Sequence, residues 1–487
     1  MSLHQAGVSW FSLDYRDLIS VPRDAAEIQS VAPHAPTVKV FRHQSRILKL
    51  AFFAFREGPR ATLLKILAAR FYSRIASQAV VVTLRDRRTG RVYRGLQHSI
   101  NQPVYYFHPS LSEAADSSPA INPFLGWSPH LPPDARERQF ASFELPENKG
   151  QPSDTELCVV GCGDYVRTYV LPAFNGFEKT LAVDFNWEVL TRPPFNGFRY
   201  RTNDFHSGLE RLPSTSRSRV ALIASYHSYH ADQAIAFLKN PRTSVILEKP
   251  PCVSQDQLAR LAQVYDPDRV LLGYNRRYIP WNGLVRDLVR DVGEPVVMTF
   301  HITEVQITPA HWYFAPNQGS RICGNLCHWV DLAVFILGQH PTSVAVARNH
   351  VRGIDYSGFS LGFADGSIAH FVANDLGDGT RGVQERISVK SESLDISIND
   401  YLSMRIWVRG RSRTRLALFR DKGHQRMYRA FRRFLSGDSK AVQTHSRDEF
   451  VSITAAYLAM VDLFYSSESE RALNGGRVPA PKPQHLP

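Results

Sequence analysis

The sequence feature that most constrains the fold is a glycine turn set between two apolar runs. The run at residues 156–160 leads into Gly161-Cys162-Gly163, a stretch of helical character follows, and a second run at residues 180–183 ends in Asp184. Strand, glycine turn, helix, strand and terminal acid, in this order, are typical of a βαβ unit that binds a dinucleotide. The pattern therefore predicts an α/β domain with a parallel sheet and helices on its faces.

Each position in this turn has a physical role. Gly161 permits a sharp bend, and Gly163 lets the backbone approach a pyrophosphate at the N-terminus of the next helix. Asp184 is placed to accept hydrogen bonds from ribose hydroxyls and to repel a 2′-phosphate, which favours NAD over NADP. Val166 stands where the dinucleotide pattern has a third small residue, so a tight turn without a ligand is the alternative. The turn residues expected to contact the cofactor are Gly161, Cys162, Gly163, Asp164, Tyr165 and Asp184.

A second functional candidate is a lysine at the end of a later strand. Residues 244–247 form a β-rich run that continues into Glu248, Lys249 and Pro250. In an open α/β sheet, ligands bind beyond the carboxyl ends of the strands, so Lys249 is expected beside the nicotinamide ring as an acid/base group. The alternative is a surface lysine paired with Glu248. Further cofactor contacts are expected from Ser225, Tyr226, His230, Glu248, Lys249 and Pro250.

Polar groups later in the chain suit a hydroxylated substrate. Arg277 follows a β-rich run, where it is a candidate to bind an anionic or polyhydroxyl ligand, or to pair with acids of the next helix. His328 and Asp331 are three positions apart and share a face if helical, and a histidine held by a carboxylate is a candidate general base. Cys323, Cys327 and His328 would crowd as zinc ligands on one short helical stretch, so no metal is expected.

The overall charge is basic. The 487 residues include 58 Lys+Arg against 45 Asp+Glu, a net charge of +13, which favours anionic partners or is simply solvated surface charge. The chain has five cysteines, and this odd number argues against a disulfide framework and for a reducing compartment. No apolar run reaches the ~18 residues of a membrane span, and no signal peptide is visible, so a cytoplasmic protein is expected.

Composition shifts divide the chain into five segments. In the first, a basic amphipathic helix pair at residues 43–76 precedes a β-hairpin at residues 79–93; the pair packs on its own domain or, alternatively, lies on a membrane surface. In the fourth, β-rich runs are expected at residues 296–304, 343–348, 356–363, 367–372 and 386–398. The segments are a basic α+β region of unknown role at 1–108, a linker or wrapping segment at 109–153, a Rossmann NAD-binding domain at 154–280, an α+β domain with a large, mostly antiparallel sheet at 281–472, and a disordered tail at 473–487.

Together these motifs resemble the glucose–fructose oxidoreductase / inositol dehydrogenase (Gfo/Idh/MocA) family over about residues 155–472. The motifs that carry the similarity are residues 159–163 with the Gly-x-Gly turn, 246–250 with Glu-Lys-Pro, 273–277 with Gly-Tyr-Asn-Arg-Arg, and 328–332 with His-Trp-Val-Asp-Leu. The resemblance implies that Lys249 and His328 flank the nicotinamide as acid/base partners. Gly324 replaces a carboxylate frequent in the family, and Asn325 stands where close relatives have an acid. The substrate side is expected to be lined by Arg277, His311, Trp312 and Asn325.

The predicted function is that of an NAD-dependent oxidoreductase acting on a sugar, nucleotide sugar or cyclic polyol. In this hypothesis Lys249 exchanges the hydroxyl proton, His328 orients or relays, and Asp331 fixes His328. A non-catalytic NAD-binding regulator or scaffold and an NAD-assisted glycoside cleavage are the alternatives. No nucleic-acid partner is expected. The resemblance implies a homo-oligomer paired through an exposed sheet face, and peripheral membrane contact by the basic N-terminal region is a further alternative.

Overall fold

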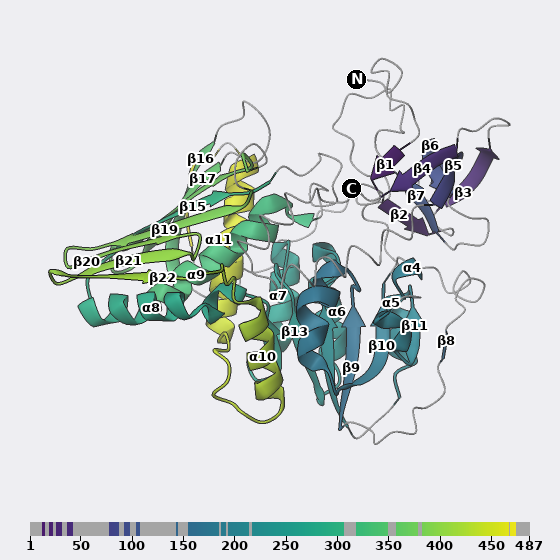
Figure 1. Ribbon diagram of the computed structural model, residues 1–487, viewed down its shortest axis with the longest axis horizontal. Coiled ribbons are helices and arrows are strands. Elements are labelled where there is room, and N and C mark those ends of the chain that lie inside the picture. Colours follow the sequence, from purple (N-terminus) through teal and green to yellow (C-terminus); the bar gives the residue numbers. More distant parts are fainter. Residues whose placement is uncertain are drawn as a thin grey trace, which may run out of the picture. The chain divides into compact units, whose positions relative to one another are not determined.

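The structure of the chain is a computed structural model (Figure 1). It describes strands β1–β8 between residues 12 and 144, and residues 154–473 with breaks at 185–186, 191–192, 214–216, 306–317, 349–356, 378–381 and 467. Among these residues, no helix is long and apolar enough to cross a membrane. They form two compact units, one ending at Arg219 and the other starting at Val220.

The N-terminal region contains a seven-stranded sheet in the order β1-β4-β5-β6-β7-β2, with β3 also paired to β5. The predicted hairpin is confirmed, since β5 and β6 pair antiparallel with Val82 opposite Gly95. The helix pair predicted at residues 43–76 lies outside the described residues. The strand bounds are β1 Ser12–Asp14, β2 Ile19–Pro22, β3 Ala26–Val31, β4 Thr37–Phe41, β5 Ser77–Asp86, β6 Val92–Gln97 and β7 Val104–Phe107.

The next part of the first unit starts the α/β region. Strands β9 (Thr155–Val160), β10 (Glu178–Val183) and β11 (Tyr200–Thr202) are parallel neighbours, and β8 (Phe143–Glu144) pairs antiparallel with β11. β9 and β10 are buried along most of their length, as expected for apolar runs in a parallel sheet. The helical elements are η3 (Val166–Val170), η4 (Leu171–Phe174), α4 (Trp187–Leu190), η5 (Phe195–Gly197) and α5 (Phe205–Glu210).

The α/β pattern continues in the second unit, which confirms the predicted fold class. Strands β12 (Ser218–Ile223), β13 (Thr243–Leu247) and β14 (Val270–Leu272) are consecutive neighbours, and β13 and β14 pair in parallel. Helix α7 begins after Ser254, whose hydroxyl accepts from the Gln257 N–H as an N-cap. The helical elements are η6 (His227–Tyr229), α6 (His230–Leu238), α7 (Gln255–Val264) and η7 (Asn275–Tyr278).

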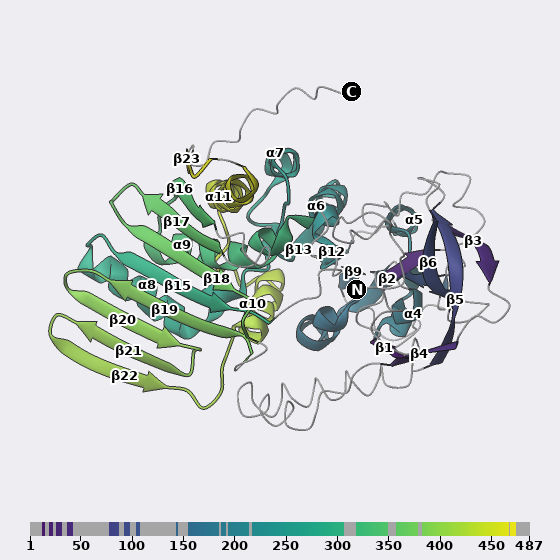
Figure 2. The same ribbon diagram turned by 90° about the horizontal axis from the view of Figure 1, so that it is seen from above.

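The rest of the second unit is an α+β domain with a nine-stranded sheet, also as predicted. The order is β22-β21-β20-β19-β15-β18-β17-β16-β23, in which β15 and β18 are parallel and every other pair of neighbours is antiparallel. Helices α8, α9 and α11 lie along one face of this sheet (Figures 1 and 2). The helices are η10 Ile322–Leu326, α8 Pro280–Val292, α9 Cys327–Leu337, α10 His424–Leu435 and α11 Arg447–Tyr465; the strands are β15 Val297–Thr303, β16 Pro341–Arg348, β17 Ser357–Phe363, β18 Ile368–Asn374, β19 Gln384–Lys390, β20 Leu394–Asn399, β21 Ser403–Val408, β22 Arg411–Leu416 and β23 Glu470–Ala472.

One predicted strand needs correction. The run at residues 386–398 is not a single strand but two, β19 and β20, joined by a turn in which the Ser391 N–H donates to Leu394 O at 2.8 Å. Glu294 fixes this turn by accepting hydrogen bonds from both Ser391 and Ser393. Glu294, the residue that fixes the turn, is thus almost 100 residues away in sequence. The pattern of apolar residues continues across the turn, so it does not show where β19 ends.

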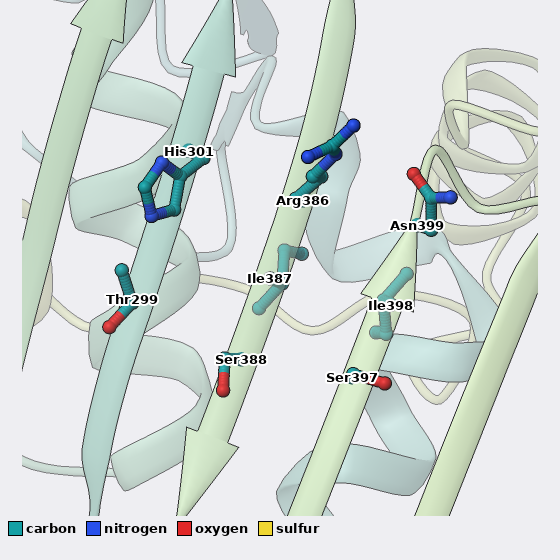
Figure 3. A pocket seen from close by; sticks show the side chains of 8 residues that line it. All are labelled: Thr299, His301, Arg386, Ile387, Ser388, Ser397, Ile398 and Asn399. Atoms are coloured by element: carbon teal, nitrogen blue, oxygen red, sulfur yellow. The ribbon is translucent and has the colours of Figure 1, made fainter.

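The open face of the sheet carries a shallow hollow of about 490 Å³. Figure 3 shows His301 and Thr299 on β15 beside Arg386 and Ser388 on β19. On β15 these residues alternate with Phe300, which packs on α9 with its ring 5.7 Å from Trp329. The hollow therefore lies on the opposite face from α9, the helix that carries His328.

Candidate active site

The glycine turn leaves β9 as the sequence predicts. Gly161 has φ +88°, a conformation that glycine adopts without strain, and its N–H donates to Val183 O at 2.8 Å. The Cys162 N–H donates to Asp184 Oδ2 at 2.7 Å. The carboxylate predicted to face the ribose is therefore tied directly to the turn.

The residues of the turn fit a dinucleotide. A Cβ placed on Gly163 would meet no heavy atom within 4 Å, so the space in front of this backbone is open. A helical segment follows the turn, and the N-terminus of such a segment is where a pyrophosphate binds. Val166, in the position of the missing third small residue, is buried at the start of π-helix η3. Asp164 accepts from Arg167 Nη2 at 2.5 Å.

Lys249 follows β13 directly, as predicted. Its side chain is half-buried, and Nζ donates to the carbonyl oxygen of Gly324 at 2.6 Å. The Lys249–Pro250 peptide is cis. Gly324 belongs to the π-helix η10, which runs straight into α9 and His328. The hydrogen bond therefore brings together two motifs, Glu-Lys-Pro and the His328 run, that are 75 residues apart in sequence.

His328 is a buried, neutral histidine. Burial, followed by the positive charges of Lys249 and Arg276, holds its pKa well below the usual value of 6.5. Its Nδ1 is buried and has no hydrogen-bond partner among the described residues. Its ring packs edge-on against Tyr274, with centroids 6.1 Å apart. A neutral imidazole with an unused nitrogen is suited to exchange a hydrogen bond with a substrate hydroxyl.

Asp331 does not hold His328, contrary to the prediction. Its carboxylate accepts from Arg277 Nε at 2.9 Å and lies 2.7 Å from His445 Nε2. Burial alone would raise the pKa of Asp331, but Arg277 and His445 outweigh it and keep the pKa low. Arg277 also reaches Glu449, so the four side chains form one network, in which Asp331, Arg277 and His445 are buried and Glu449 is half-buried. The i,i+3 spacing correctly predicted that His328 and Asp331 share a helix, but the Asp331 carboxylate pairs with Arg277 and His445 instead.

The four residues predicted to contact substrate differ in where the structure places them. Arg277 is buried and committed to Asp331 and Glu449, so its predicted contact with substrate has no support in the structure. Asn325 Nδ2 donates to Glu304 Oε1 at 2.6 Å, which leaves its amide half-buried beside an acid. His311 and Trp312 lie outside the described residues.

Glu248 is a buried carboxylate rather than a surface one, and it has a donor that the sequence did not indicate. The Tyr428 hydroxyl of α10 donates to Glu248 Oε1, and Glu248 is 5% exposed. A Cβ on Gly273 would lie 2.6 Å from the same oxygen, so glycine at this position leaves room for the carboxylate. Tyr428 carries no sequence signal for this role, because it lies 180 residues from Glu248.

His230 joins the loop after β12 to the Lys249–Pro250 segment. Its Nδ1 lies 2.8 Å from Pro250 O and its Nε2 lies 3.0 Å from Ser225 O. Burial outweighs these two acceptors and lowers the pKa of His230 to about 4. Ser225 Oγ donates to Gln233 Oε1 at 2.7 Å, and Tyr226 is the N-cap residue of η6. His230 is therefore placed to fix the backbone on which Lys249 stands.

A basic cluster close to Lys249 and His328 was not predicted. Arg276 Nη2 lies 2.5 Å and Lys422 Nζ 3.2 Å from Glu385 Oε1, and all three belong to one ion network. Burial would raise the pKa of Glu385, but Arg276 and Lys422 lower it to about 2. His424 at the start of α10 is kept neutral, because burial, Arg276 and Lys422 lower its pKa. The adjacent arginines at residues 276–277 were a visible signal, but their buried partners were not.

Metal ligands do not assemble in the part of the chain that the structure describes. No group of three or more His, Cys, Asp or Glu side chains there is arranged to hold a metal ion. All five cysteines are free and buried. Burial raises the pKa of Cys327 to about 12, so this thiol beside His328 stays protonated at neutral pH.

Comparison with known families agrees with this geometry. Residues 156–275 match the family described as "Oxidoreductase family, NAD-binding Rossmann fold", and residues 284–393 match the "GFO/IDH/MocA C-terminal domain". Each of these two parts of the chain therefore matches a model of the Gfo/Idh/MocA oxidoreductases, and NAD is the cofactor of the Rossmann domain. No curated protein matches the chain.

Solved structures of similar fold include three oxidoreductases. Levoglucosan dehydrogenase, in complex with NADH and levoglucosan, is 16% identical, with a TM-score of 0.54 over 66% of this chain and 100% of that chain. The WlbA dehydrogenase from Bordetella pertussis, in complex with NADH and UDP-GlcNAcA, is 16% identical, with a TM-score of 0.53 over 66% and 99%. An oxidoreductase domain protein from Kribbella flavida is 16% identical, with a TM-score of 0.55 over 65% and 98%. At such identities the similarity establishes the fold.

Proposed function

We propose that this oxidoreductase transfers hydride between NAD and an alcohol carbon of a sugar, nucleotide sugar or cyclic polyol. The observation that carries the proposal is the hydrogen bond from Lys249 Nζ to Gly324 O, which holds an amine next to the segment of neutral His328. The names of two proteins of similar fold, levoglucosan dehydrogenase and the WlbA dehydrogenase with UDP-GlcNAcA, support a sugar-like substrate.

The turn at residues 161–163 and Lys249 fall within the same matched domain, so we assign them to the same cofactor. Bound NAD supplies the hydride acceptor at its nicotinamide ring. Lys249 takes the proton of the substrate hydroxyl as the alcohol is oxidised, and returns it when the carbonyl is reduced. Because the carbonyl of Gly324 accepts from Nζ in either protonation state, the amine keeps its position while its proton count changes.

His328 is proposed to orient the reacting hydroxyl rather than to act as a charged acid. Its neutral imidazole can donate from one nitrogen and accept at the other, which suits a hydroxyl that is both donor and acceptor. Asp331 and Arg277 are assigned to positioning α9 through their buried network, not to substrate contact. Asn325, held by Glu304, remains a proposed substrate contact.

The decisive experiment replaces the amine. Purified Lys249→Ala protein is tested for NAD-linked oxidation of a panel of sugars, nucleotide sugars and cyclic polyols, and for NAD affinity by calorimetric titration. We expect kcat/KM to fall by about 10²- to 10⁴-fold, the usual contribution of one acid/base group, while NAD binding persists. The control is Lys239→Ala, which removes an exposed lysine after α6 and should leave both quantities unchanged.

Three outcomes would contradict the proposal. Full turnover in Lys249→Ala would remove Lys249 from the chemistry. Tight NAD binding with no redox change on any substrate would point to a regulator or scaffold. Catalytic turnover of a glycoside with no net NADH would indicate transient oxidation followed by cleavage.

The oligomeric state is a separate proposal. By the family resemblance, we propose a homo-oligomer paired through the open face of the nine-stranded sheet. The hollow around His301 and Arg386 offers polar groups for such a contact (Figure 3). Light scattering coupled to size exclusion would measure it, and a monomer at micromolar concentration would contradict it.

A further inference from the structure

Helix α10 is anchored at its N-terminus to η7, the short helix that follows β14. Asn275 Nδ2 donates to Lys422 O at 2.6 Å, and a Cβ on Gly423 would lie 2.3 Å from Asn275 O. Gly423 has φ +83°, a conformation in which glycine makes this close approach without strain. Further along α10, the Phe431 ring packs edge-on against Tyr278 with centroids 5.7 Å apart. The helix is therefore fixed relative to η7 and the end of β14.

One turn into α10, Tyr428 reaches the residue that follows β13. Its side chain is fully buried, and its hydroxyl donates to Glu248 Oε1. On another side the carboxylate meets Gly273, where a Cβ would lie 2.6 Å from Oε1 and 2.8 Å from Oε2. Glu248 is thus held between a tyrosine hydroxyl and a glycine backbone. A hydroxyl that donates to a carboxylate stabilises its ionised form.

Several elements bring titratable or charged groups to the surroundings of Lys249. Burial comes first among the causes that lower the pKa of three histidines, and each of them also interacts with the Lys249 charge. Burial raises the pKa of a nearby thiol to about 12. The histidines and the thiol are therefore neutral at neutral pH, and two cations of the region share Glu385 Oε1 as an acceptor. These groups are His230 on α6, Arg276 on η7, Cys327 and His328 on α9, Lys422 before α10 and His424 on α10.

Glu248 brings negative charge to the same place. It precedes Lys249 in the chain, and after burial the charges of Lys249 and Glu248 act on the pKa of Cys327 in opposite directions. Glu304, at the end of β15, is half-exposed and accepts from Asn325, so solvent screens its charge more strongly. Glu248 is therefore the buried acid that is placed to favour the protonated form of the Lys249 amine.

We infer that Tyr428 is a positioning residue of the proposed active site: it holds the Glu248 carboxylate beside Lys249 and so sets the pH at which this amine exchanges its proton. The inference rests on the proposed function for its consequence, which is the pH dependence of alcohol oxidation. Oxidation uses the neutral amine as the base, so its rate rises as the amine loses its proton. Negative charge beside the amine moves this loss to higher pH. Because Tyr428 acts through Glu248, it needs no contact with the substrate.

The test follows the Lys249 amine itself. The full chain is labelled with traces of acetic anhydride from about pH 6 to pH 11, and acetylation of Lys249 is measured by peptide mass spectrometry, since only the neutral amine reacts. Glu248→Gln keeps an acceptor for the Tyr428 hydroxyl but carries no charge, so the midpoint of labelling should fall by about one pH unit. Tyr428→Phe should lower it by about half a unit or more, because a buried carboxylate without its donor loses part of its charge. The double variant should have the midpoint of Glu248→Gln alone.

The control is Tyr401→Phe, which removes a buried hydroxyl that is hydrogen-bonded to the uncharged side chain of Asn282. It should lose stability as Tyr428→Phe does, yet keep the labelling midpoint of the unmodified protein. Thermal unfolding checks that each variant is folded. Glu248→Gln retains the hydrogen bond from Tyr428, so the effect of the charge can be measured even if Tyr428→Phe does not fold.

Three results would overturn the inference: an unchanged midpoint in Glu248→Gln, an equal shift in Tyr401→Phe, or a double variant whose shift is the sum of the two single shifts. Turnover separates this inference from the proposed function. Midpoints that shift as expected in a protein with no NAD-linked oxidation would contradict only the proposed function. An active enzyme in which neither the midpoints nor the pH profile of kcat/KM moves would contradict only the role of Tyr428.

Discussion

At the scale of single residues, the surroundings of Lys249 are held by contacts that leave little room for change. Glu248 is buried, receives the Tyr428 hydroxyl, and lies against the Cα of Gly273. A buried carboxylate that loses its donor keeps the full cost of desolvation, so this arrangement is sensitive to small displacements. The sequence shows Glu248 and Gly273 plainly, but only the fold shows that they touch.

We expect Gly273→Ala to destabilise the protein by about 1–3 kcal/mol, because the new methyl would displace a buried carboxylate from its hydrogen bond. The control is Gly283→Ala within α8, where a Cβ meets nothing within 4 Å and alanine should stabilise by about 0.5–1 kcal/mol. Urea denaturation measures both. Equal stability of Gly273→Ala and the unmodified protein would show that Glu248 moves aside without loss.

At the scale of elements, local patterns predicted the elements well, whereas contacts between distant residues could not be predicted. Helix α11, for example, starts at a capping box between Ser446 and Glu449, which is a purely local feature of the sequence. Strand β22 was missed because its run of Arg, Ser and Thr has no apolar alternation. His445 and Asp331 are 114 residues apart, so the spacing of residues in the sequence could not show that they pair. For the same reason the sequence could not show that Asp331 does not hold His328.

Asp184, directly after β10, is expected to determine the choice between NAD and NADP. Because the carboxylate of Asp184 is fixed by the Cys162 N–H, it cannot swing away from a 2′-phosphate. We expect Asp184→Ser to lower the preference for NAD over NADP by about 10- to 100-fold in the ratio of Kd values, since a like charge is removed. Calorimetric titration with both cofactors measures the ratio. Asp232→Ser, a change of an exposed acid on α6, is the control, and an unaltered preference in Asp184→Ser would exclude Asp184 from the ribose site.

At the scale of the whole molecule, buried histidines make the fold sensitive to acid. Burial lowers the pKa of His230, His328, His424 and His445. Below the unfolded value of about 6.5, the unfolded chain therefore binds more protons than the folded one, and stability falls as pH falls. Glu385 adds to the trend at lower pH: its pKa is lowered to about 2, so its stabilising contribution is present above 4.5 and lost toward 2.

The acid sensitivity can be tested at His230 alone. Its pKa is about 4, so between pH 4 and pH 6.5 this histidine is neutral in the folded protein and protonated in the unfolded chain. The unmodified protein should lose up to about 2 kcal/mol at pH 5 relative to pH 7 from this residue alone. His230→Asn should be less stable at pH 7, because a bond to Pro250 or Ser225 is lost, yet it should lose less on acidification. Urea denaturation at the two pH values measures the difference. If both proteins lose the same free energy between pH 7 and pH 5, His230 is not held neutral by the fold, and the acid sensitivity must come from the other three histidines.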